Sequence, residues 1–296
     1  MIKTLAARIP GRIKRQLRVI WNPSTAITQP EPIPDISRPQ PMDLMGVANS
    51  TLAYRETLKE VVLNVGLVLE IGPYFRPVLV GNNVSYFDVR TSAELTERAE
   101  LEGYSTEAIP TVDYVSPIGD LSVVDEKFDA VLSAHCIEHQ PDFVDHLNKV
   151  GSLLNPGGRY YAIIPDKRYC FDNKIPESSI AQIISAHLEK RKVHSPQSVI
   201  EHRALTTHND PLRHWQNDND DAGLDSAYIE RIRSSIVEWR SSNGSYVDVH
   251  ACQFTPLSFK SIVNTLAQLD MIKLQLETVF ETPFPRNEFI AILKAV

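Results

Sequence analysis

The chain has 296 residues, of which 43% are hydrophobic and 23% charged, so it is long enough to bury one large core with an appended segment. This length and composition exclude a small scaffold held together by disulfides or metal ions. Thirty basic and thirty-seven acidic residues give a formal net charge of −7. We therefore expect no nucleic-acid partner, because such proteins normally present a basic face.

Residues 1–21 form a basic amphipathic segment in this otherwise acidic chain. Six Lys and Arg residues, and no acid, are interleaved with apolar side chains up to Trp21. Such a segment can lie on an anionic membrane surface, where each basic residue contributes ~1 kcal/mol. A solvated terminus is the alternative, because Pro10 and Gly11 interrupt any single helix. The prolines of residues 22–43 then predict a linker or an extended arm.

From about residue 44 onward, the chain alternates between helical spacing of apolar residues and short apolar runs typical of strands. Apolar residues recur at helical spacing as far as Val65. Five short apolar runs then have the composition of strands buried on both faces, and they span 67–72, 84–88, 108–113, 128–134 and 158–164. Helical patterns at 92–102 and 141–154 lie between them. This alternation predicts a doubly wound α/β fold with a parallel sheet.

The alternation stops after Pro165, where a polar stretch rich in His and Asn lies between two helical patterns. The remaining predicted elements are helices at 178–190, 226–240 and 256–269 and strands at 272–280 and 287–295. An insertion after the fifth strand lies above the carboxyl edge of such a sheet, where ligands bind. We therefore interpret residues 165–250 as a substrate lid inserted into a domain that spans 44–296.

The cysteines and the lack of long apolar segments bear on the cellular compartment. Cys136, Cys170 and Cys252 are an odd number without C-x-x-C spacing, which favours reduced thiols over a disulfide framework. No stretch reaches the about 18 to 20 apolar residues of a membrane span. The first residues also lack the apolar core of a signal peptide. We expect a cytoplasmic protein, with peripheral contact at the inner face of the membrane if residues 1–21 bind lipid.

The first two predicted strands end in residues that suit a ligand. Glu70 and Gly72 lie at a strand-to-helix turn, where backbone amides can face an anionic group. Tyr74 stands where a dinucleotide-binding turn has another glycine, which disfavours a nicotinamide cofactor. Asp88 ends the second strand, where an acid can accept hydrogen bonds from a ribose diol. Its alternative role is to cap the helix that follows.

These motifs form an ordered series along the chain. Glu-x-Gly follows the first strand and Asp88 the second, a Gly119–Leu121 loop precedes the fourth strand, and Leu153–Gly158 precedes the fifth. The series resembles that of the class I S-adenosylmethionine-dependent methyltransferases. The resemblance covers about 67–164 and extends to 256–296, which matches the closing antiparallel pair of that fold. It implies a Rossmann-like, doubly wound sheet of seven strands with an antiparallel last strand.

The resemblance also implies S-adenosyl-L-methionine as the cofactor. It places eight residues at that ligand: Glu70, Gly72, Pro73, Asp88, Asp113, Asp120, Leu121 and His135. Gly72 and its neighbours would meet the methionine part and Asp88 the ribose hydroxyls. The loop around Asp120 and Leu121 would flank adenine, and His135 would lie beneath the sulfonium. Asp113, at the end of the predicted third strand, competes for the adenine or ribose contact.

Residues 163–172, which follow Ile137–Asp142, look like a bacterial subgroup associated with glycosyltransferases and surface-polysaccharide assembly. This resemblance implies a methyl acceptor that is a hydroxyl of a sugar or glycan, a role in polysaccharide biosynthesis, and a glycosyltransferase partner. A nitrogen acceptor stays open. The lost glycine at Tyr74 motivates an alternative, in which the domain is an inert methyltransferase-like scaffold for such a partner.

His139 is the leading candidate for a catalytic base. It comes just after the fourth strand, and an unperturbed histidine titrates near the operating pH. A hydroxyl acceptor needs such a base, whereas the sulfonium already carries the activation of the methyl group. The alternative is a structural histidine that caps or packs on the helix beginning near Pro141.

A metal site is a further alternative for this segment. The residues His135-x-x-Glu138-His139 are comparable with the Glu-x-x-Glu-His motif of quinone O-methyltransferases. Because His135 replaces the first acid, we expect no metal.

The lid contributes further polar candidates. The spacing of its histidines matches no zinc pattern, and some are expected to line the acceptor pocket and others to lie on the surface; they are His194, His202, His208, His214 and His250. Lys167 and Arg168 either bind an anionic acceptor or pair with Asp166 and Asp172.

Overall fold

A computed structural model of the chain describes residues 51–221 and 224–296. The basic segment 1–21, the linker 22–43 and the predicted start of the domain near residue 44 lie outside the described residues. Within the described residues, no helix is both long and apolar enough to cross a lipid bilayer.

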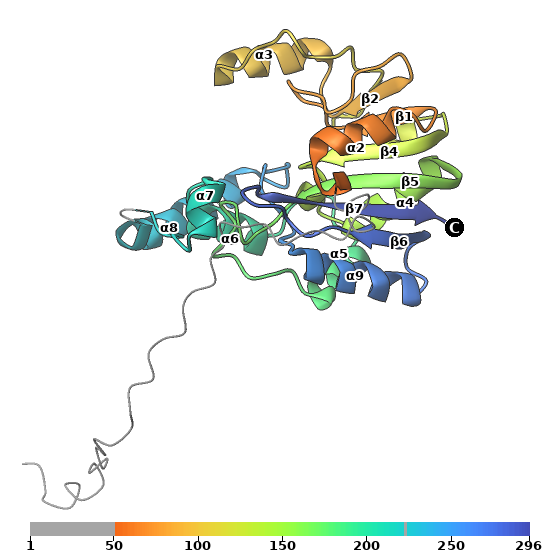
Figure 1. The fold of residues 1–296 in the computed structure, drawn as a ribbon. Helices are drawn as coiled ribbons and strands as arrows, with labels where there is room; N and C mark the ends of the chain where they lie inside the picture. The colour runs from red at the N-terminus through yellow and green to blue at the C-terminus, as the bar shows by residue number, and fades with distance from the viewer. Residues whose placement is uncertain (1–50, 222–223) are drawn as a thin grey trace, which may run out of the picture. The chain divides into compact units, whose positions relative to one another are not determined.

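The described residues build one mixed β-sheet of seven strands (Figure 1). The strands are β1 Val68–Ile71, β2 Val84–Asp88, β3 Tyr114–Val115, β4 Phe128–Ala134, β5 Leu154–Pro165, β6 Leu274–Val279 and β7 Glu288–Ala295. Their order is β3-β2-β1-β4-β5-β7-β6. Strands β1 to β5 pair in parallel, and β7 pairs antiparallel with both β5 and β6. The predicted doubly wound sheet with an antiparallel last strand is confirmed.

Helices lie on both faces of this sheet and beyond its carboxyl edge. They are α2 Arg55–Val62, α3 Ser92–Glu102, α4 Phe143–Leu153, α5 Ile180–Leu188, α6 Pro196–Leu205, α7 Pro211–Trp215, α8 Leu224–Ser241 and α9 Pro256–Gln268, with short 3₁₀ turns η1 Thr51–Ala53, η2 Leu121–Val123 and η3 Ile137–His139. Alternate strand residues point to opposite faces. Leu69 and Ile71 pack with α4 and α9, whereas Val68 packs with α2. The apolar runs are therefore buried on both sides, as predicted.

The bounds of α3 follow from its end signals. Thr91 caps the first turn, accepting the backbone N–H of Glu94, whose side chain accepts the N–H of Thr91 in return. Gly103 ends the helix in the left-handed conformation, at φ +78°. The predicted range 92–102 is confirmed. Because Thr91 is the cap, Asp88 does not have the capping role that was its alternative.

Two parts of the expected secondary structure are wrong. The third strand is the two-residue edge segment Tyr114–Val115 rather than 108–113, where Pro110 lacks the N–H that a paired strand donates. Asp113 therefore precedes this strand instead of ending it. The polar stretch of the lid contains α6 and α7, each of which has proline in its first turn after a capping Ser195 or Asp210.

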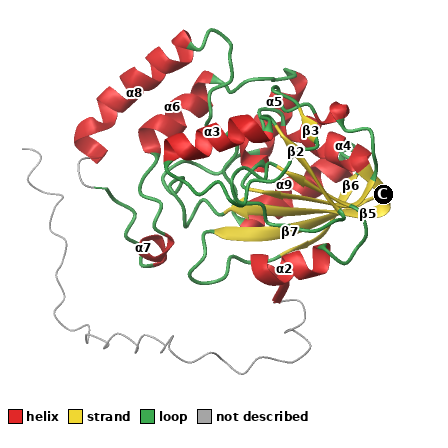
Figure 2. Ribbon diagram, turned by 90° about the horizontal axis from the view of Figure 1, so that it is seen from above, coloured by secondary structure: helices red, strands yellow, loops and turns green. Residues whose placement is uncertain are grey.

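The lid leaves the sheet and returns to it at one point. Asp166 and Phe254 form an isolated parallel bridge, and the N–H of Lys167 donates to the carbonyl of Phe254 at 2.9 Å. Between them, α6 and α8 pack on each other. Helices α6, α7 and α8 lie beyond the carboxyl ends of the parallel strands (Figures 1 and 2).

Candidate active site

Two cavities at the carboxyl edge of the sheet share one wall. The first, of about 270 Å³, lies between the ends of β1 and β2 and the loop that contains Gly119. The second, of about 500 Å³, lies between η3 and the lid. We call them the cofactor cavity and the acceptor cavity. Four side chains line both: Tyr74, His135, His139 and Asp248.

The cofactor cavity contains four of the eight residues predicted to meet the cofactor, and they are Gly72, Asp88, Leu121 and His135. Asp88 is buried, and its Oδ1 accepts the backbone N–H of Arg90 at 3.1 Å. Burial raises the pKa of the Asp88 carboxyl, against the lowering effect of nearby backbone N–H groups such as that of Arg90. Sequence reasoning missed Arg98, Gln140 and Tyr246, which also line this cavity.

The turn after β1 keeps a left-handed backbone conformation although Tyr74 stands in place of its second glycine. Gly72 has φ +71°, and its N–H donates to the carbonyl of Phe87 at 2.8 Å. Tyr74, at the position of the second glycine, has φ +46° and so adopts the left-handed conformation itself. A side chain in this conformation costs about 1 kcal/mol. The phenol hydroxyl of Tyr74 donates to Glu102 at 2.7 Å, and the guanidinium of Arg98 lies 4.8 Å from the ring centre.

The other four predicted residues do not line the cofactor cavity, and they are Glu70, Pro73, Asp113 and Asp120. The buried Glu70 carboxylate accepts the backbone N–H groups of Val78 and Leu79 at 2.7 and 2.8 Å. Burial raises the pKa of Glu70 to about 7 in spite of these donors. Asp120 caps η2 and pairs with Lys149 at 3.0 Å. These carboxylates hold segments around the cavity in place.

The carboxylate of Asp113 is similarly engaged with the backbone, since it accepts the N–H of Tyr86 at 2.8 Å. This contact ties the segment before β3 to β2. Asp113 therefore lies beside the second strand, away from the cavity that it was expected to line.

His135, at the end of β4, faces β7. It has φ +50°, and its Nε2 lies 2.7 Å from Oε2 of Glu288, which also pairs with Arg55 of α2 at 2.7 Å. Burial raises the pKa of the Glu288 carboxyl, but the hydrogen bonds from His135 and Arg55 outweigh it and lower that pKa to about 2. His135 thus pairs with Glu288, and it is not among the side chains that converge with Glu138 and His139 on one point.

His139 lies on the wall between the two cavities. Its Nδ1 is 3.1 Å from Oδ1 of Asp248, a lid residue that sequence reasoning did not assign to the site. Burial lowers the pKa of the half-buried His139 imidazole, but the Asp248 carboxylate and the charge of Glu138 outweigh burial and raise it. The cap of α4 is Asp142, which accepts the N–H of Asp145 at 2.9 Å. The capping alternative for His139 is therefore wrong.

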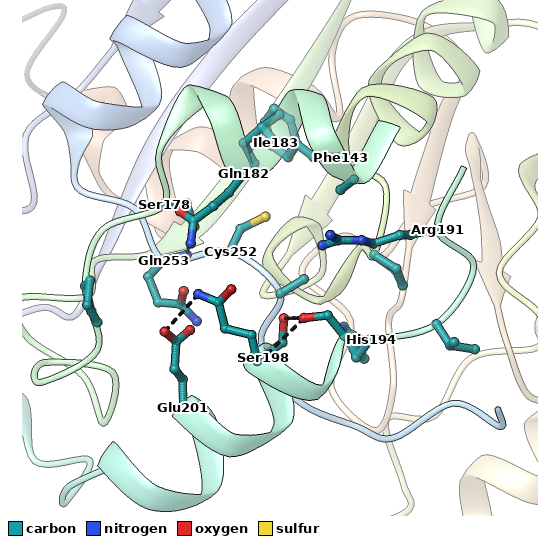
Figure 3. Close-up of a pocket in the computed structure, with 17 residues that line it drawn as sticks. Phe143, Ser178, Gln182, Ile183, Arg191, His194, Ser198, Glu201, Cys252 and Gln253 are labelled. Atoms are coloured by element: carbon teal, nitrogen blue, oxygen red, sulfur yellow. Dashed lines mark hydrogen bonds between the residues drawn. The ribbon is translucent and has the colours of Figure 1, made fainter. Parts of the chain in front are cut away.

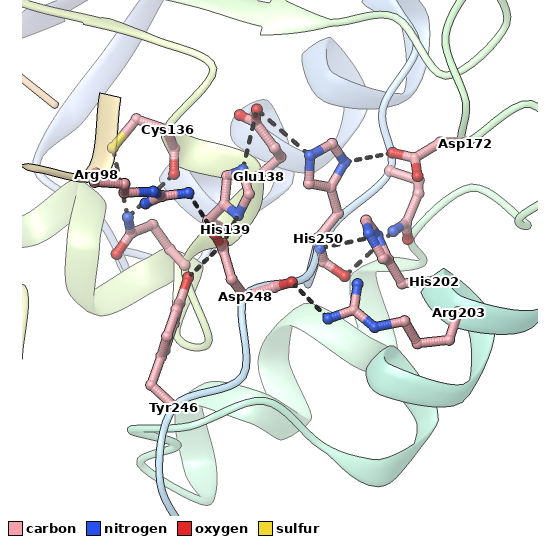
Figure 4. A network of polar contacts seen from close by, with 12 residues as sticks. Arg98, Cys136, Glu138, His139, Asp172, His202, Arg203, Tyr246, Asp248 and His250 are labelled. Atoms are coloured by element: carbon pink, nitrogen blue, oxygen red, sulfur yellow. Dashed lines mark hydrogen bonds and ion pairs between the residues drawn. The ribbon is translucent and has the colours of Figure 1, made fainter. Parts of the chain in front are cut away.

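A cluster of acids and histidines joins η3 to the lid (Figure 4). Glu138 is buried, and Nε2 of His139 and Nε2 of His250 each lie 3.9 Å from its Oε1. On its other side, His250 presents Nδ1 to Oδ2 of Asp172 at 2.5 Å. The backbone N–H of His250 donates to Nδ1 of His202 at 3.3 Å. Glu138, His202 and His250 line the acceptor cavity.

The main chain brings this cluster together. The carbonyl of Glu138 accepts the backbone N–H groups of Ala251 and Cys252 at 2.7 and 3.1 Å. The end of the lid is thereby fixed beside η3. A sequence signal for this contact is absent, because the two segments lie more than a hundred positions apart.

The remaining lid candidates are engaged elsewhere. The rings of His208 and His214 stack with their centres 4.1 Å apart, and Nε2–H of His214 donates to the carbonyl oxygen of His208 at 2.9 Å. Arg168 binds both oxygens of Asp166, and Nζ of Lys167 donates to the carbonyl of Asn173 at 2.9 Å. For Arg168 the structure thus bears out pairing with Asp166.

A third cavity lies between α5, α6 and the returning chain (Figure 3). Its volume is about 40 Å³, and its lining includes His194, Arg191 and Gln253. A cavity of this size holds one or two water molecules. His194 therefore faces a space that is too small for a cofactor or a sugar.

Comparisons with known proteins identify the sheet and its loops. Residues 72–162 match the family model of a methyltransferase domain. No curated protein matches the chain. In the search of solved structures, the mitomycin 7-O-methyltransferase MmcR matches with 11% identity and a TM-score of 0.38, covering 85% of this chain and 55% of that one. This chain thus spans about half the length of that enzyme.

Two further structures match at the same level. Magnesium protoporphyrin IX methyltransferase from Synechocystis PCC 6803, with bound SAH, has 10% identity and a TM-score of 0.37, with 88% of this chain and 90% of that one covered. The CcbJ methyltransferase from Streptomyces caelestis has 12% identity and a TM-score of 0.41, with 82% and 94% covered.

The strand order agrees with the match to a methyltransferase domain. The order β3-β2-β1-β4-β5-β7-β6, with β7 antiparallel to both of its neighbours, is the one that the sequence resemblance implies. The matched domain contains the turn at Gly72, Asp88 and the loop at Leu121, which line the cofactor cavity. Residues 72–162 thus match a methyltransferase domain, and the sheet around them has the strand order that the resemblance to class I S-adenosylmethionine-dependent methyltransferases implies, with S-adenosyl-L-methionine as the cofactor.

Proposed function

We propose that this enzyme methylates a hydroxyl oxygen of a sugar or glycan. The observation that carries the proposal is the common wall of the two cavities, formed by Tyr74, His135, His139 and Asp248. A methyl donor in one cavity and an acceptor in the other would meet at this wall. Holding the two reactants in line for transfer lowers the activation free energy by up to roughly 7 to 11 kcal/mol.

The cofactor cavity fits S-adenosyl-L-methionine, which supplies a methyl group activated by its sulfonium. Asp88 offers a buried carboxylate to the ribose hydroxyls, and one of its oxygens already has a backbone partner. The left-handed turn at Gly72 and Tyr74 lets the main chain run along the wall of this cavity. Leu95 and Leu121 supply apolar surface for the base.

The lining of the acceptor cavity supports a sugar. The carboxylate of Glu138 and the amides of Asn209 and Asn287 can pair with several hydroxyls. The rings of Tyr104 and Phe171 offer faces for the apolar side of a pyranose. Such a mixture of polar and aromatic side chains favours a polyhydroxyl acceptor over a purely apolar one.

We assign activation of the acceptor hydroxyl to His139, the base predicted from the sequence. It lines both cavities, and Asp248 lies 3.1 Å from its Nδ1. The carboxylate holds the imidazole so that Nε2 faces away from Asp248, where it can act on the acceptor. Asp248 is a positioning residue in this assignment.

The wider context of the reaction extends this proposal. The sequence resemblance supports polysaccharide biosynthesis as the setting and a glycosyltransferase as a partner. Residues 1–21 would hold the enzyme at an anionic membrane surface through their basic side chains, with 22–43 as the linker to the domain. The same organisation makes 165–250 the lid that selects the acceptor.

The proposal is tested by incubating the full chain with methyl-deuterated S-adenosyl-L-methionine and a panel of sugars, uronates and oligosaccharides. We expect mass spectrometry to find a deuterated methyl ether. His139→Ala should lower turnover by about 10²- to 10⁴-fold with little change in the affinity for S-adenosylhomocysteine. His208→Ala is the matched control, because His208 lines neither cavity.

Three outcomes would contradict parts of the proposal. Transfer to nitrogen would replace the oxygen acceptor. Tight binding of S-adenosylhomocysteine without transfer to any member of a broad glycan panel would favour the inert scaffold. Turnover of His139→Ala at the level of His208→Ala would remove His139 from the reaction.

A further inference from the structure

Glu138 is a buried carboxylate, and its nearest potential cations are two histidines at 3.9 Å. Its side chain is 1% exposed, and neither oxygen has a hydrogen-bond partner within the described residues. Burying an ionised carboxylate in this state is costly, and buried charges are normally paired or bound to a metal ion. A cation bound beside Glu138 would compensate this charge.

The atoms around Glu138 supply the rest of a coordination site. We propose that Glu138, His139 and His250 bind one divalent transition-metal ion. Their ligand atoms all lie within 4.8 Å of one another, and each Nε2 is 3.9 Å from Oε1 of Glu138. Ligands that are each about 2.0 to 2.2 Å from one ion lie roughly 3 to 4 Å apart, so the side chains need only small movements.

Both histidines are oriented for this role by a second carboxylate. Oδ2 of Asp172 lies 2.5 Å from Nδ1 of His250, and Oδ1 of Asp248 lies 3.1 Å from Nδ1 of His139. A carboxylate at one ring nitrogen fixes the proton there and leaves the other nitrogen free to bind a metal. In both residues the nitrogen that faces Glu138 is Nε2 (Figure 4).

The ligand set indicates the class of metal. Two imidazoles and one carboxylate suit Zn²⁺, Mn²⁺, Fe²⁺ or Co²⁺ better than Mg²⁺ or Ca²⁺, which prefer oxygen ligands. All three residues line the acceptor cavity, so the open positions of the ion would face the acceptor. This proposal departs from the expectation of no metal that the sequence analysis gave. That expectation was based on the set His135, Glu138 and His139, whereas the proposed set contains His250 instead of His135.

The consequence for catalysis rests on the proposed function. An ion at this site would bind an acceptor hydroxyl and ease the loss of its proton to water. His139 would then activate the hydroxyl as a ligand of the ion rather than as the direct proton acceptor. Binding of the ion itself does not depend on the identity of the acceptor.

The test uses Co²⁺, whose visible absorption reports imidazole ligands, together with calorimetry on the full chain after treatment with chelator. We expect one equivalent to bind. Glu138→Gln and His250→Ala should each weaken binding by at least about 100-fold, and Asp172→Asn by about 10- to 100-fold. His194→Ala, which removes a buried histidine that lines neither large cavity, should leave binding unchanged.

Affinity for S-adenosylhomocysteine separates this inference from the proposed function. Neither Glu138 nor His250 lines the cofactor cavity, so folded variants should keep this affinity. If Glu138→Gln fails to fold, His250→Ala decides the question. A wild-type chain that binds S-adenosylhomocysteine but no Co²⁺ overturns the metal site and leaves His139 as the direct base. Unchanged Co²⁺ binding in folded Glu138→Gln and His250→Ala also overturns it.

Discussion

The two cavities share a wall but are built in different ways. The cofactor cavity takes most of its lining from a contiguous part of the chain, from Ile71 to His146, and the lid adds only Tyr246 and Asp248. The acceptor cavity collects residues from the strand edges, η3, the lid and the start of β7. The cofactor cavity is therefore formed mainly by the sheet and its loops, whereas the acceptor cavity is formed between the sheet and the lid.

The largest expected effect concerns Glu288, which holds the boundary of both cavities through His135 and Arg55. Its pKa is lowered to about 2 in the folded chain, so the stability that it contributes is present above its unfolded pKa and is lost as the pH falls toward 2. Glu288→Gln should lower the free energy of unfolding at pH 7 by about 3 kcal/mol. Denaturant titrations from pH 7 to pH 3 measure this difference.

The control for Glu288 is Glu277→Gln. Glu277 forms an exposed pair with Arg159 on the same sheet, and such pairs contribute about 0 to 1 kcal/mol. The difference between the wild type and Glu288→Gln should shrink below about pH 4.5. A difference that stays constant down to pH 3 would show that the carboxylate charge of Glu288 does not stabilise the boundary.

The next effect tests whether the cofactor cavity depends on the residues that line it. Asp88→Ala should weaken binding of S-adenosyl-L-methionine by ~1.5 to 3 kcal/mol, because it removes a charge-assisted acceptor. Asp120→Ala is the matched control, since Asp120 belongs to the predicted adenine loop but lies outside the lining. Calorimetry compares the two. Equal losses in both variants would contradict the assignment of the ribose contact to Asp88.

A smaller effect is expected where the lid meets the wall. Asp248→Asn keeps the size of the side chain but removes the charge beside His139, so turnover should fall by about 10-fold. The Michaelis constant for the acceptor should change little, because Asp248 acts through His139. Steady-state kinetics separate the two parameters. A change confined to the Michaelis constant would instead make Asp248 a binding residue for the acceptor.

The smallest effect concerns the turn after β1. Tyr74→Gly restores the glycine that the backbone conformation favours by about 1 kcal/mol, while it removes the contact of the phenol with Glu102. The two changes oppose each other, so cofactor affinity should stay within about 5-fold of the wild type. Calorimetry with S-adenosylhomocysteine measures it. A loss of 100-fold would make the tyrosine ring an essential part of the cofactor cavity.

The same contrast between the two cavities explains which parts of the fold and of the site could be predicted from the sequence. Strands β1, β2 and β4 and helix α3 were predicted to within about two residues, because buried runs and end caps are local signals. The third strand was misplaced, since two residues at the sheet edge leave no periodicity. Glu70 was expected at the cofactor because it precedes Gly72, yet its carboxylate is engaged with the backbone at Val78 and Leu79.

The acceptor side was less accessible to sequence reasoning. Glu138 and His139 are neighbours and were both considered. Asp172 and His250 come to them only through tertiary contacts, such as the hydrogen bonds to the carbonyl of Glu138. Spacing rules for metal sites look for ligands within one segment, so they cannot detect a group whose members come from both ends of an insertion.

The bridge between Asp166 and Phe254 has a consequence for how acceptor choice can change. Both ends of the lid are fixed side by side, and the cost of closing a loop rises only slowly with its length. Residues between these points can therefore be exchanged, lengthened or shortened with little strain on the sheet. Exchange of this one contiguous stretch would remodel the acceptor cavity, whereas the cofactor cavity would keep its lining from residues 71–146 and change only at Tyr246 and Asp248.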